Sequence, residues 1–384
     1  MDLINCPVCK STDLEKIYDA CSAPVYCNLL WDDRESAVNC PKGSIQLQYC
    51  RRCGYIFNSD FDTELLDYDV EYENSLHFSR KFETYAQSLA QRLVEHYRLY
   101  DKKIIEIGCG RGDFLKLLCK LGDNHGIGFD PSYHEGTVDN DASGNIIIIK
   151  DYYGGKYSSL EPDFILARQT VEHIPDPVKF LRTILATTGN KTIPLFIEVP
   201  NMVYTLKNMF IWDIIYEHYS YFTPISVNAL LAMSGYNASL ISDEFGGQFM
   251  GAHAIPGEGE IIDGSIFDKE VDRFKCRYPE WISEWKAQVK KDINEGKNIV
   301  VWGSGSKGVT FLNILGMGSG IEYAVDINPR KNGRYIAGTG QKIISPQQLI
   351  DVKPDIVLIM NPLYEQEIRS TLANLKIDPQ VMII

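Results

Sequence analysis

The sequence predicts an α/β protein of three parts, and three observations carry that prediction. Residues 103–115 and residues 295–308 each combine a short β-branched run, a turn rich in glycine and the start of an apolar helix. This order is typical of the first strand, turn and helix of a doubly wound parallel sheet. The third observation is a pair of C-x2-C motifs within the first 53 residues. We therefore expect domains at residues 1–62, 63–245 and 246–384.

Composition and charge indicate a folded protein whose partners are small molecules. Of the 384 residues, 45% are hydrophobic and 11% aromatic, and 51 acidic against 38 basic side chains give a formal net charge of −13. This negative charge disfavours binding to nucleic acid or to an anionic membrane. No 18-residue apolar stretch is present, and the first residues lack the basic start and apolar core of a secretory signal. We expect a cytoplasmic protein, as a monomer or a weak homodimer.

The first domain is predicted to hold a structural zinc ion. Cysteines stay reduced in the cytoplasm, so the spacing of the ten cysteines is informative. The motifs C-P-V-C and C-R-R-C each present two thiolates, and two such motifs complete one tetrahedral zinc site with no position left for water. Cys21, Cys27 and Cys40 lie between the motifs and are expected to be small buried residues. The predicted zinc ligands are Cys6, Cys9, Cys50 and Cys53.

The second domain starts with a glycine turn whose flanking acids suit a cationic ligand. Glycines at positions 108, 110 and 112 allow close approach to the backbone, and Glu106 precedes the turn while Asp113 follows it. These acids would repel a diphosphate. Asp130 ends the next strand, where doubly wound sheets bind a ribose diol. Asp151 follows the third strand and could accept a hydrogen bond from an adenine amine.

This pattern resembles the class I S-adenosylmethionine-dependent methyltransferases, whose first motif is E-x-G-x-G-x-G. Residues 163–177 resemble the family's fourth strand and the loop over the cofactor, and residues 195–201 resemble its fifth strand. The alternative, a Rossmann-like dehydrogenase, would have a third glycine where Asp113 stands. The resemblance implies S-adenosylmethionine as the cofactor. The implied cofactor contacts are Glu106, Gly108, Gly110, Gly112, Asp130, Asp151 and Gln169.

The third domain repeats the strand, turn and helix with a turn of different polarity. Residues 303–308 read G-S-G-S-K-G, so serines and a lysine replace the acids. Such a turn suits an anion such as a diphosphate, and Ser304 and Lys307 are the predicted contacts. The alternative is a degenerate Rossmann-like unit that only packs against the rest of the protein.

Together the three parts resemble the sugar C-methyltransferases of deoxysugar biosynthesis. Those enzymes methylate a carbon next to the ketone of a nucleotide-linked keto-sugar. The likeness extends over almost the whole chain, and residues 325–339 resemble the family's D-x-N-P-x-K-x-G run, with Ala337 in place of the usual proline. The implied fold is a class I methyltransferase doubly wound sheet, flanked by an N-terminal zinc-binding module and a C-terminal Rossmann-like α/β domain.

Bond formation at a carbon next to a ketone needs a base and groups that hold the enolate oxygen. Resemblance to the family's E-H-x-S-Y-F motif implies that His218 is the base and that Glu217 fixes or tunes it. The family often has Y-H-E-H, whereas Tyr216 directly precedes Glu217 here. The hydroxyl that serves the enolate therefore stays open, with Tyr216 as one option.

Three further segments are expected near the reacting atoms. His173, next to Glu172, either reaches the transfer site or closes over the cofactor. Tyr72 matches the family's Y-x-x-S segment, and the glycine pair before Gln248 resembles the lining of the sugar site. The predicted catalytic residues are His218, Glu217, Tyr216, Tyr72 and His173. The predicted substrate contacts are Tyr221, Gly247, Gln248, Ser304 and Lys307.

Two other functions remain open from the sequence. The same scaffold could methylate an oxygen or nitrogen of a sugar or other small metabolite, in which case His218 would deprotonate a hydroxyl or amine. A non-catalytic protein that binds nucleotide sugars is the other alternative. The set of three acids at positions 106, 130 and 151 argues against it, since a pocket without the cofactor has no use for all three.

Overall fold

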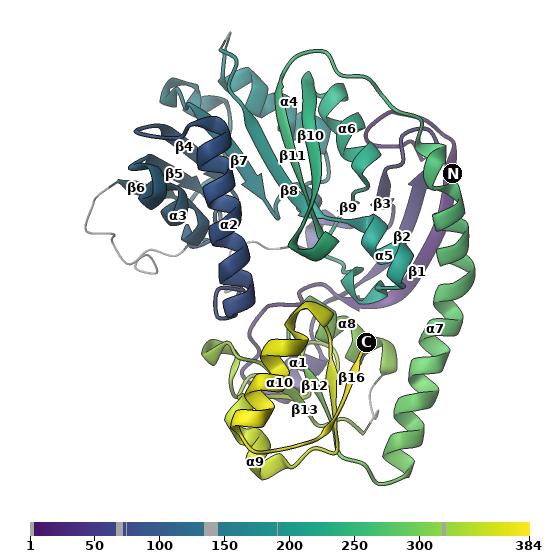
Figure 1. The fold of residues 1–384 in the computed structure, drawn as a ribbon. Coiled ribbons are helices and arrows are strands. Elements are labelled where there is room, and N and C mark those ends of the chain that lie inside the picture. The colour runs from purple at the N-terminus through teal and green to yellow at the C-terminus, as the bar shows by residue number, and fades with distance from the viewer. Residues whose placement is uncertain (1–3, 67–71, 74, 134–144, 190, 317–319) are drawn as a thin grey trace.

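The computed structural model describes residues 4–66, 72–73, 75–133, 145–189, 191–316 and 320–384, which form three sheets (Figure 1). The first sheet is antiparallel. Across it the order is β1 (Leu14–Pro24), β2 (Lys42–Cys50), β3 (Ile56–Asn58) and β9 (Ser220–Tyr221). Helix α1 (Arg34–Val38) separates β1 from β2 in the chain. Because β9 begins two residues after His218, the predicted catalytic segment is held by this sheet.

The second sheet is doubly wound and has seven strands. Five are parallel, in the spatial order β8 (Leu195–Pro200), β7 (Phe164–Arg168), β4 (Lys103–Ile107), β5 (His125–Phe129) and β6 (Ile146–Ile149). Beyond β8, the antiparallel strands β11 (Phe249–Pro256) and β10 (Tyr236–Glu244) complete the sheet. The strand order reverses between β4 and β7, which is where such sheets bind their ligands.

Helices cover both faces of the second sheet because its strands are apolar on both sides. One face packs against α2 (Arg80–Tyr97) and α3 (Asp113–Gly122) through Ile104 and Leu166. The opposite face packs against α4 (Pro177–Thr187) and α6 (Pro224–Met233) through Ile105 and Ile165. The short helix α5 (Met202–Asn208) follows β8. Successive residues of each strand thus serve opposite layers.

The third sheet is parallel and has five strands. Its order is β14 (Lys342–Ile344), β13 (Tyr323–Val325), β12 (Ile299–Trp302), β15 (Ile356–Ile359) and β16 (Gln380–Ile383). The helices of this part are α8 (Ser306–Leu315), α9 (Leu349–Val352) and α10 (Glu365–Asn374). The α/β fold class and its doubly wound sheet are therefore confirmed, and a second parallel sheet closes the chain.

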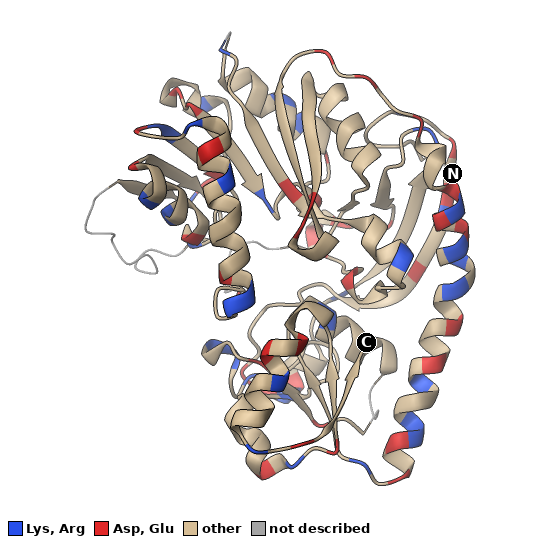
Figure 2. Ribbon diagram, in the orientation of Figure 1, with Lys and Arg blue, Asp and Glu red and all other residues tan. Residues whose placement is uncertain are grey.

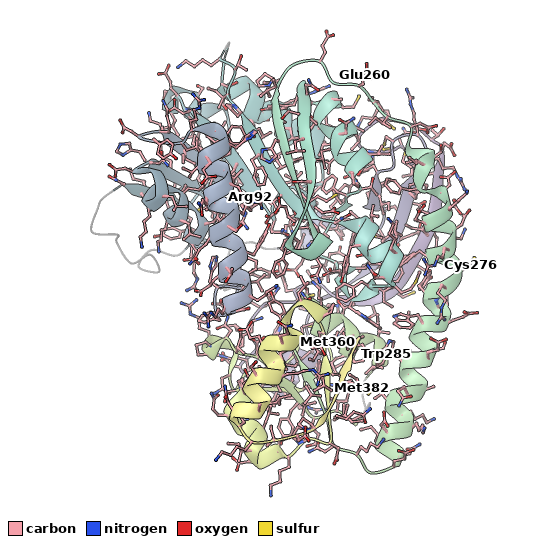
Figure 3. All side chains as sticks on the ribbon, viewed as in Figure 1. Arg92, Glu260, Cys276, Trp285, Met360 and Met382 are labelled. Carbon is pink, nitrogen blue, oxygen red and sulfur yellow. The ribbon has the colours of Figure 1, made fainter. Side chains whose placement is uncertain are left out.

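Helix α7 (Asp268–Asn294) connects the parts (Figure 1). It runs from the first sheet to β12, and its exposed side carries charges of both signs (Figure 2). Its Trp285 belongs to a core cluster with Met360 after β15 and Met382 on β16 (Figure 3). No helix of the described ranges is long and apolar enough to cross a membrane.

The sheets do not follow the predicted domain limits in two places. Strand β9 pairs with β3 of the first sheet although it lies within residues 63–245. Strand β11 pairs with β8 of the second sheet although it lies beyond residue 245. The division into three domains stays a prediction. The local sequence did not reveal the main-chain pairing between these distant segments.

Candidate functional site

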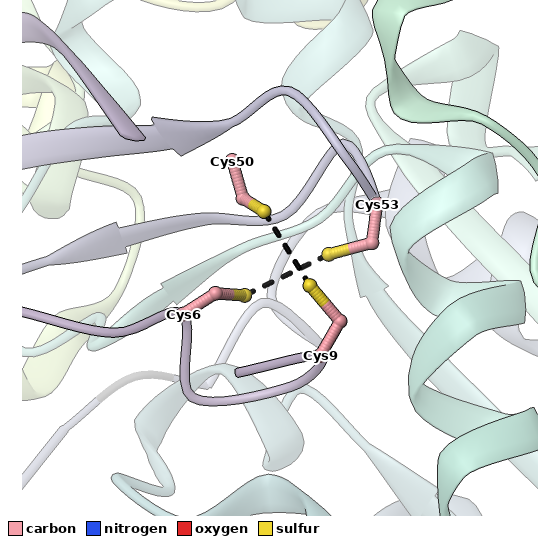
Figure 4. A group of neighbouring side chains, drawn as sticks. All are labelled: Cys6, Cys9, Cys50 and Cys53. Carbon is pink, nitrogen blue, oxygen red and sulfur yellow. Dashed lines mark hydrogen bonds between the residues drawn. The ribbon is translucent and has the colours of Figure 1, made fainter. Parts of the chain in front are cut away.

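The four predicted zinc ligands lie together (Figure 4). Cys6 Sγ is 3.7 Å from Cys53 Sγ, and Cys9 Sγ is 3.5 Å from Cys50 Sγ, with all four side chains buried. Both motifs form tight turns, in which Lys10 N donates to Cys6 O and Gly54 N donates to Cys50 O. The cysteines are not joined as disulfides. Four converging thiols of this kind could hold one metal ion.

The cysteine cluster packs against the second sheet. It shares a hydrophobic core with residues of β4, β7 and β8 and with Phe222 and Val227 beyond β9. Tyr55, next to the second cysteine pair, makes a short hydrogen bond to Ser220 in β9. A metal ion here would therefore stabilise the contact between the first two sheets. Of the other cysteines, Cys27 and Cys40 are buried as expected, but Cys21 is exposed on β1.

The glycine turn after β4 has the open backbone that the sequence predicts. Gly108, Gly110 and Gly112 have φ values of 71°, 53° and 72°, a region that favours glycine. Nothing lies within 4 Å of a Cβ built on Gly110, so this part of the turn is open. The amide of Gly110 donates to Asp130 Oδ2 at 2.8 Å, which ties the turn to the end of β5. The turn and Asp130 thus form one unit.

Glu106 lies on β4, two residues before the first glycine of this turn. It is 3% exposed, accepts a hydrogen bond from the Leu115 amide, and has no partner for Oε2 among the described residues. Burial raises the pKa of Glu106 to about 8, against the opposing effect of Arg168. A buried carboxylate oxygen without a partner is costly unless a ligand or a proton satisfies it.

Two other predicted cofactor contacts already have partners. Asp151 accepts from Tyr157 Oη at 2.5 Å and pairs with Lys156, which lowers its pKa. Gln169 has a φ of 48° and donates to Glu198 Oε1 at 3.1 Å. The structure therefore places both at the carboxyl ends of strands, with their polar atoms turned to protein groups.

A buried polar network below the turn was missed by the sequence reasoning. Glu198 is fully buried in β8 and accepts from Arg168 Nη2 at 3.0 Å, from Gln169 and, in a short bond, from Tyr85. The guanidinium of Arg168 also lies 3.7 Å from the centre of the Phe114 ring. A lone acid within the apolar run L-F-I-E-V and an arginine at the end of F-I-L-A-R were the available signals.

His173 and His218 face each other, from the loop after β7 and the loop before β9. Their ring centres are 4.9 Å apart and the rings are nearly perpendicular. His173 follows β7 three residues after Thr170, whose Oγ1 donates to Ile107 O just before the glycine turn. Burial lowers the pKa of His173 to about 4 and that of His218 well below its usual range. Both imidazoles are therefore neutral near pH 7, with a free lone pair each.

Glu172, expected beside His173, also lies close to His218, which the sequence did not indicate. Its side chain is 1% exposed, and apart from a contact with its own main-chain amide neither carboxylate oxygen has a hydrogen-bond partner in the described part of the chain. Burial raises its pKa to about 8. Donor atoms of Glu172, His173 and His218 all lie within 4.8 Å of one another.

Glu217 points away from its neighbour His218. Its Oε2 accepts from the amide of Cys27 at 2.9 Å, and its carboxylate also accepts from the hydroxyl of Tyr72. Asn28 Nδ2 in turn donates to Tyr72 Oη at 3.2 Å. The expected pairing of Glu217 with His218 is absent among the described contacts; the two residues lie at a turn in which His218 N donates to Ile215 O. What links Glu217 to the histidines is its main-chain oxygen, which lies 2.9 Å from His173 Nδ1.

The two tyrosine hydroxyls of this segment bond to the main chain. Tyr216 is fully buried, its ring stacks on Phe61, and its hydroxyl bonds to the amide and carbonyl of Asp62. The Tyr221 hydroxyl donates to Ile215 O at 2.7 Å. Tyr221 still packs against the His218 ring, at 5.9 Å between centres. Tyr216 therefore lies in the wall of the first sheet and not beside the histidines.

The predicted substrate contacts of the third part lie at its junction with the second. Gln248 and Asn361 exchange two side-chain hydrogen bonds, of 2.8 and 2.9 Å. Lys307 pairs with Asp213 at 2.7 Å, and Ser304 Oγ donates to Asp326 at 2.5 Å. Gly247 O accepts from Asn201 Nδ2 at 3.0 Å. The contacts of Gln248 and Lys307 cross the junction, whereas those of Ser304 and Gly247 lie within one part each. The contact of these residues with a substrate stays a prediction.

Comparison with known proteins identifies the two α/β parts. Residues 78–239 match the family described as methyltransferase domain, and residues 265–381 match the family described as C-methyltransferase C-terminal domain. The C-methyltransferase NovU from Streptomyces niveus is 25% identical over 387 residues, which cover 94% of this chain and 90% of that protein. The chain is an S-adenosylmethionine-dependent methyltransferase.

Solved structures of other methyltransferases are similar to about half of this chain. The magnesium protoporphyrin IX methyltransferase ChlM from Synechocystis PCC 6803, with bound SAH, is 11% identical and covers 50% of this chain and 91% of its own, with a TM-score of 0.37. The plantazolicin methyltransferase BpumL in complex with SAH is 16% identical, with coverages of 47% and 88% and a TM-score of 0.38.

The site of the methyltransferase fits its methyl donor. The space over Gly110 is open, and the unpartnered Oε2 of Glu106 lies beneath the same turn. Asp130 keeps acceptor capacity beyond its bonds to Gly110 and Ser132, since each carboxylate oxygen can accept more than one hydrogen bond. An acid-rich cradle of this kind suits a ligand that carries a sulfonium and an ammonium group.

Proposed function

We propose that this enzyme transfers the methyl group of S-adenosylmethionine to a carbon next to the ketone of a nucleotide-linked keto-sugar. Similarity to a C-methyltransferase over 94% of the chain supports transfer to carbon, as does the match of residues 265–381 to a C-methyltransferase C-terminal domain. The observation that carries the proposal is the pair of partly buried, facing imidazoles, His173 and His218, in the loops after β7 and before β9. A carbon acid needs a neutral base of this kind, held out of water.

We assign proton removal to His218, with His173 beside it. The carbonyl of Glu217 holds Nδ1 of His173, so the ring orientation of His173 is fixed by the main chain. Tyr72 and the Glu217 carboxylate form the hydrogen-bonded wall on the other side of the loop. S-adenosylmethionine supplies the electrophilic methyl group. Its proposed contacts are Glu106, Gly108, Gly110, Gly112, Asp130, Asp151 and Gln169.

We also propose that the cysteine cluster binds one structural zinc ion. Four buried thiols from two tight turns, with sulfur pairs at 3.5 and 3.7 Å, support this assignment. The set has no open position, so the ion would act on folding and not on the reaction. The nucleotide part of the substrate is proposed to approach Ser304, Lys307 and Gln248 at the junction of the second and third sheets.

The test is to incubate the protein with labelled S-adenosylmethionine and a panel of nucleotide keto-sugars, and to locate the new methyl group by NMR. We expect a new carbon–carbon bond, and exchange of the neighbouring proton with deuterium from solvent in the absence of the methyl donor. His218→Ala should abolish both, whereas His125→Ala, at an exposed position on β5, should change neither. A methoxy or N-methyl product without exchange would contradict the proposal and favour transfer to oxygen or nitrogen.

A further inference from the structure

Beyond the proposed function, we propose that Glu172, His173 and His218 bind one divalent transition-metal ion, in a site separate from the four cysteines. Their donor atoms come from two loops, one after β7 and one before β9, and all lie within 4.8 Å of one another. Two imidazoles and one carboxylate are a common ligand set for such ions. Three independent features of the geometry support this assignment.

The first feature is the carboxylate of Glu172. It is 1% exposed, and apart from a contact with its own main-chain amide neither oxygen has a hydrogen-bond partner among the described residues. Burying a carboxylate costs several kcal/mol unless a cation or hydrogen-bond donors compensate. No side-chain cation of the described chain pairs with it. A metal ion between Glu172 and the two histidines would supply the missing positive charge.

The second feature is the orientation of His173. Its Nδ1 lies 2.9 Å from the carbonyl oxygen of Glu217, an acceptor, so Nδ1 carries the proton and Nε2 carries the lone pair. Histidine ligands of metals are typically held in this way, with the second ring nitrogen donating to a carbonyl or carboxylate. The main chain thus fixes the tautomer that a metal ligand requires.

The third feature is the ring of His218. It makes no hydrogen bond in the described ranges and meets the His173 ring almost at right angles, at 77°. The positive charge of Lys307 acts on the His218 ring, but this ammonium group is already paired with Asp213 at 2.7 Å. Its repulsion toward a cation is therefore partly cancelled. Three protein ligands leave a coordination position free, unlike the closed set of four thiolates.

The ion would have a direct effect on the reaction, and this consequence rests on the proposed function. Coordination uses the lone pair of His218 that we assign to proton removal. Occupation of the site and proton removal by His218 therefore exclude each other. Added Zn2+ or Co2+ should inhibit methyl transfer, and a chelator that leaves the four-thiolate site intact should restore it.

The site itself is tested by cobalt titration of the full-length protein with its cysteine site loaded with zinc. We expect one further equivalent of Co2+, with the weak visible bands of nitrogen and oxygen ligands and no thiolate charge-transfer band. Glu172→Gln and His218→Asn should each weaken this binding at least tenfold, whereas Glu258→Gln, at an exposed position, should leave it unchanged. Far-ultraviolet circular dichroism of each variant checks that it is folded.

The outcomes separate the two proposals. No second equivalent of metal, or equal binding by wild type and Glu172→Gln, overturns the metal site and leaves the proposed function standing. A second equivalent that activates methyl transfer keeps the metal site but refutes His218 as the base. A second equivalent with inhibition that a chelator reverses supports both.

Discussion

Glu73 joins the glycine turn after β4 to the part of the chain that holds the third sheet. It is 3% exposed and accepts from Arg111 Nη2 at 3.1 Å, in the glycine turn. It also accepts from Arg330 Nη1 at 2.9 Å and from Asn328 Nδ2 at 3.1 Å, both in the third part. One buried carboxylate thus bridges two cations, Arg111 and Arg330, which lie more than 200 residues apart in the chain.

The perturbation is Glu73→Gln, which keeps the shape of the side chain and removes its charge. Breaking a buried ion pair costs roughly 3–5 kcal/mol. The arginine side chains here are 31% and 45% exposed, so water compensates them in part. We therefore expect a loss of about 2–3 kcal/mol in the free energy of unfolding. Arg111 should also lose its fixed position, which raises the KM for S-adenosylmethionine.

The assay is equilibrium unfolding in urea, followed by the fluorescence of Trp285 and Trp302, which are buried in the third part. Glu258→Gln, at an exposed position, is the control. A double-mutant cycle with Arg330→Gln should give a coupling energy of about 1 kcal/mol, because the Arg330 side chain is half exposed although Glu73 is buried. The reasoning is refuted if Glu73→Gln unfolds at the same urea concentration as the control and the cycle shows no coupling.

Three further predictions concern single positions. Cys6→Ser should release the ion of the cysteine cluster and lower the melting temperature, whereas Cys21→Ser, on an exposed side chain, should do neither; metal analysis and thermal unfolding compare the two. Burial raises the pKa of Glu106 to about 8, so the free energy of unfolding falls as pH rises above the unfolded pKa near 4.5. Glu106→Gln should therefore stabilise the apoprotein by up to about 3 kcal/mol at pH 7 and by little at pH 4. The same change should weaken cofactor binding, measured by calorimetry. Tyr216→Phe removes the hydrogen bonds to Asp62 and should cost about 1–2 kcal/mol of stability with kcat unchanged, and a collapse of kcat would return the enolate role to this hydroxyl.

The order of strands and helices was accessible from the sequence because its signals are local. The β-branched run before Gly108 and the apolar spacing after Asp113 predict β4 and α3 from neighbouring residues alone. The same holds for β12 and α8 around the second glycine turn. Two tight turns of the C-x2-C type likewise name four candidate ligands without reference to the rest of the chain. The resemblance to methyltransferases followed from these local patterns, and the comparisons confirm it.

The direction in which each polar side chain points was decided only by tertiary structure. Glu217 and His218 are adjacent in sequence, yet the Glu217 carboxylate accepts a hydrogen bond from the Cys27 amide and the His218 ring packs against His173. The loop lies between these two distant segments, and each side chain contacts a different one. Tyr216 is drawn to Asp62 for the same reason. These partners lie tens to hundreds of residues away, so no local pattern can specify them.

The sequence by itself thus determined the fold class, the methyl donor and the candidate metal-binding cysteines, since each depends on residues within one turn or one strand. Only the tertiary structure decided that Glu172, and not Glu217, is the acid beside the two histidines. It also decided that Lys307 forms an ion pair with Asp213. The physical reason is burial: a charged group removed from water is costly in free energy unless it is paired, and the packing of remote segments determines which partner is available.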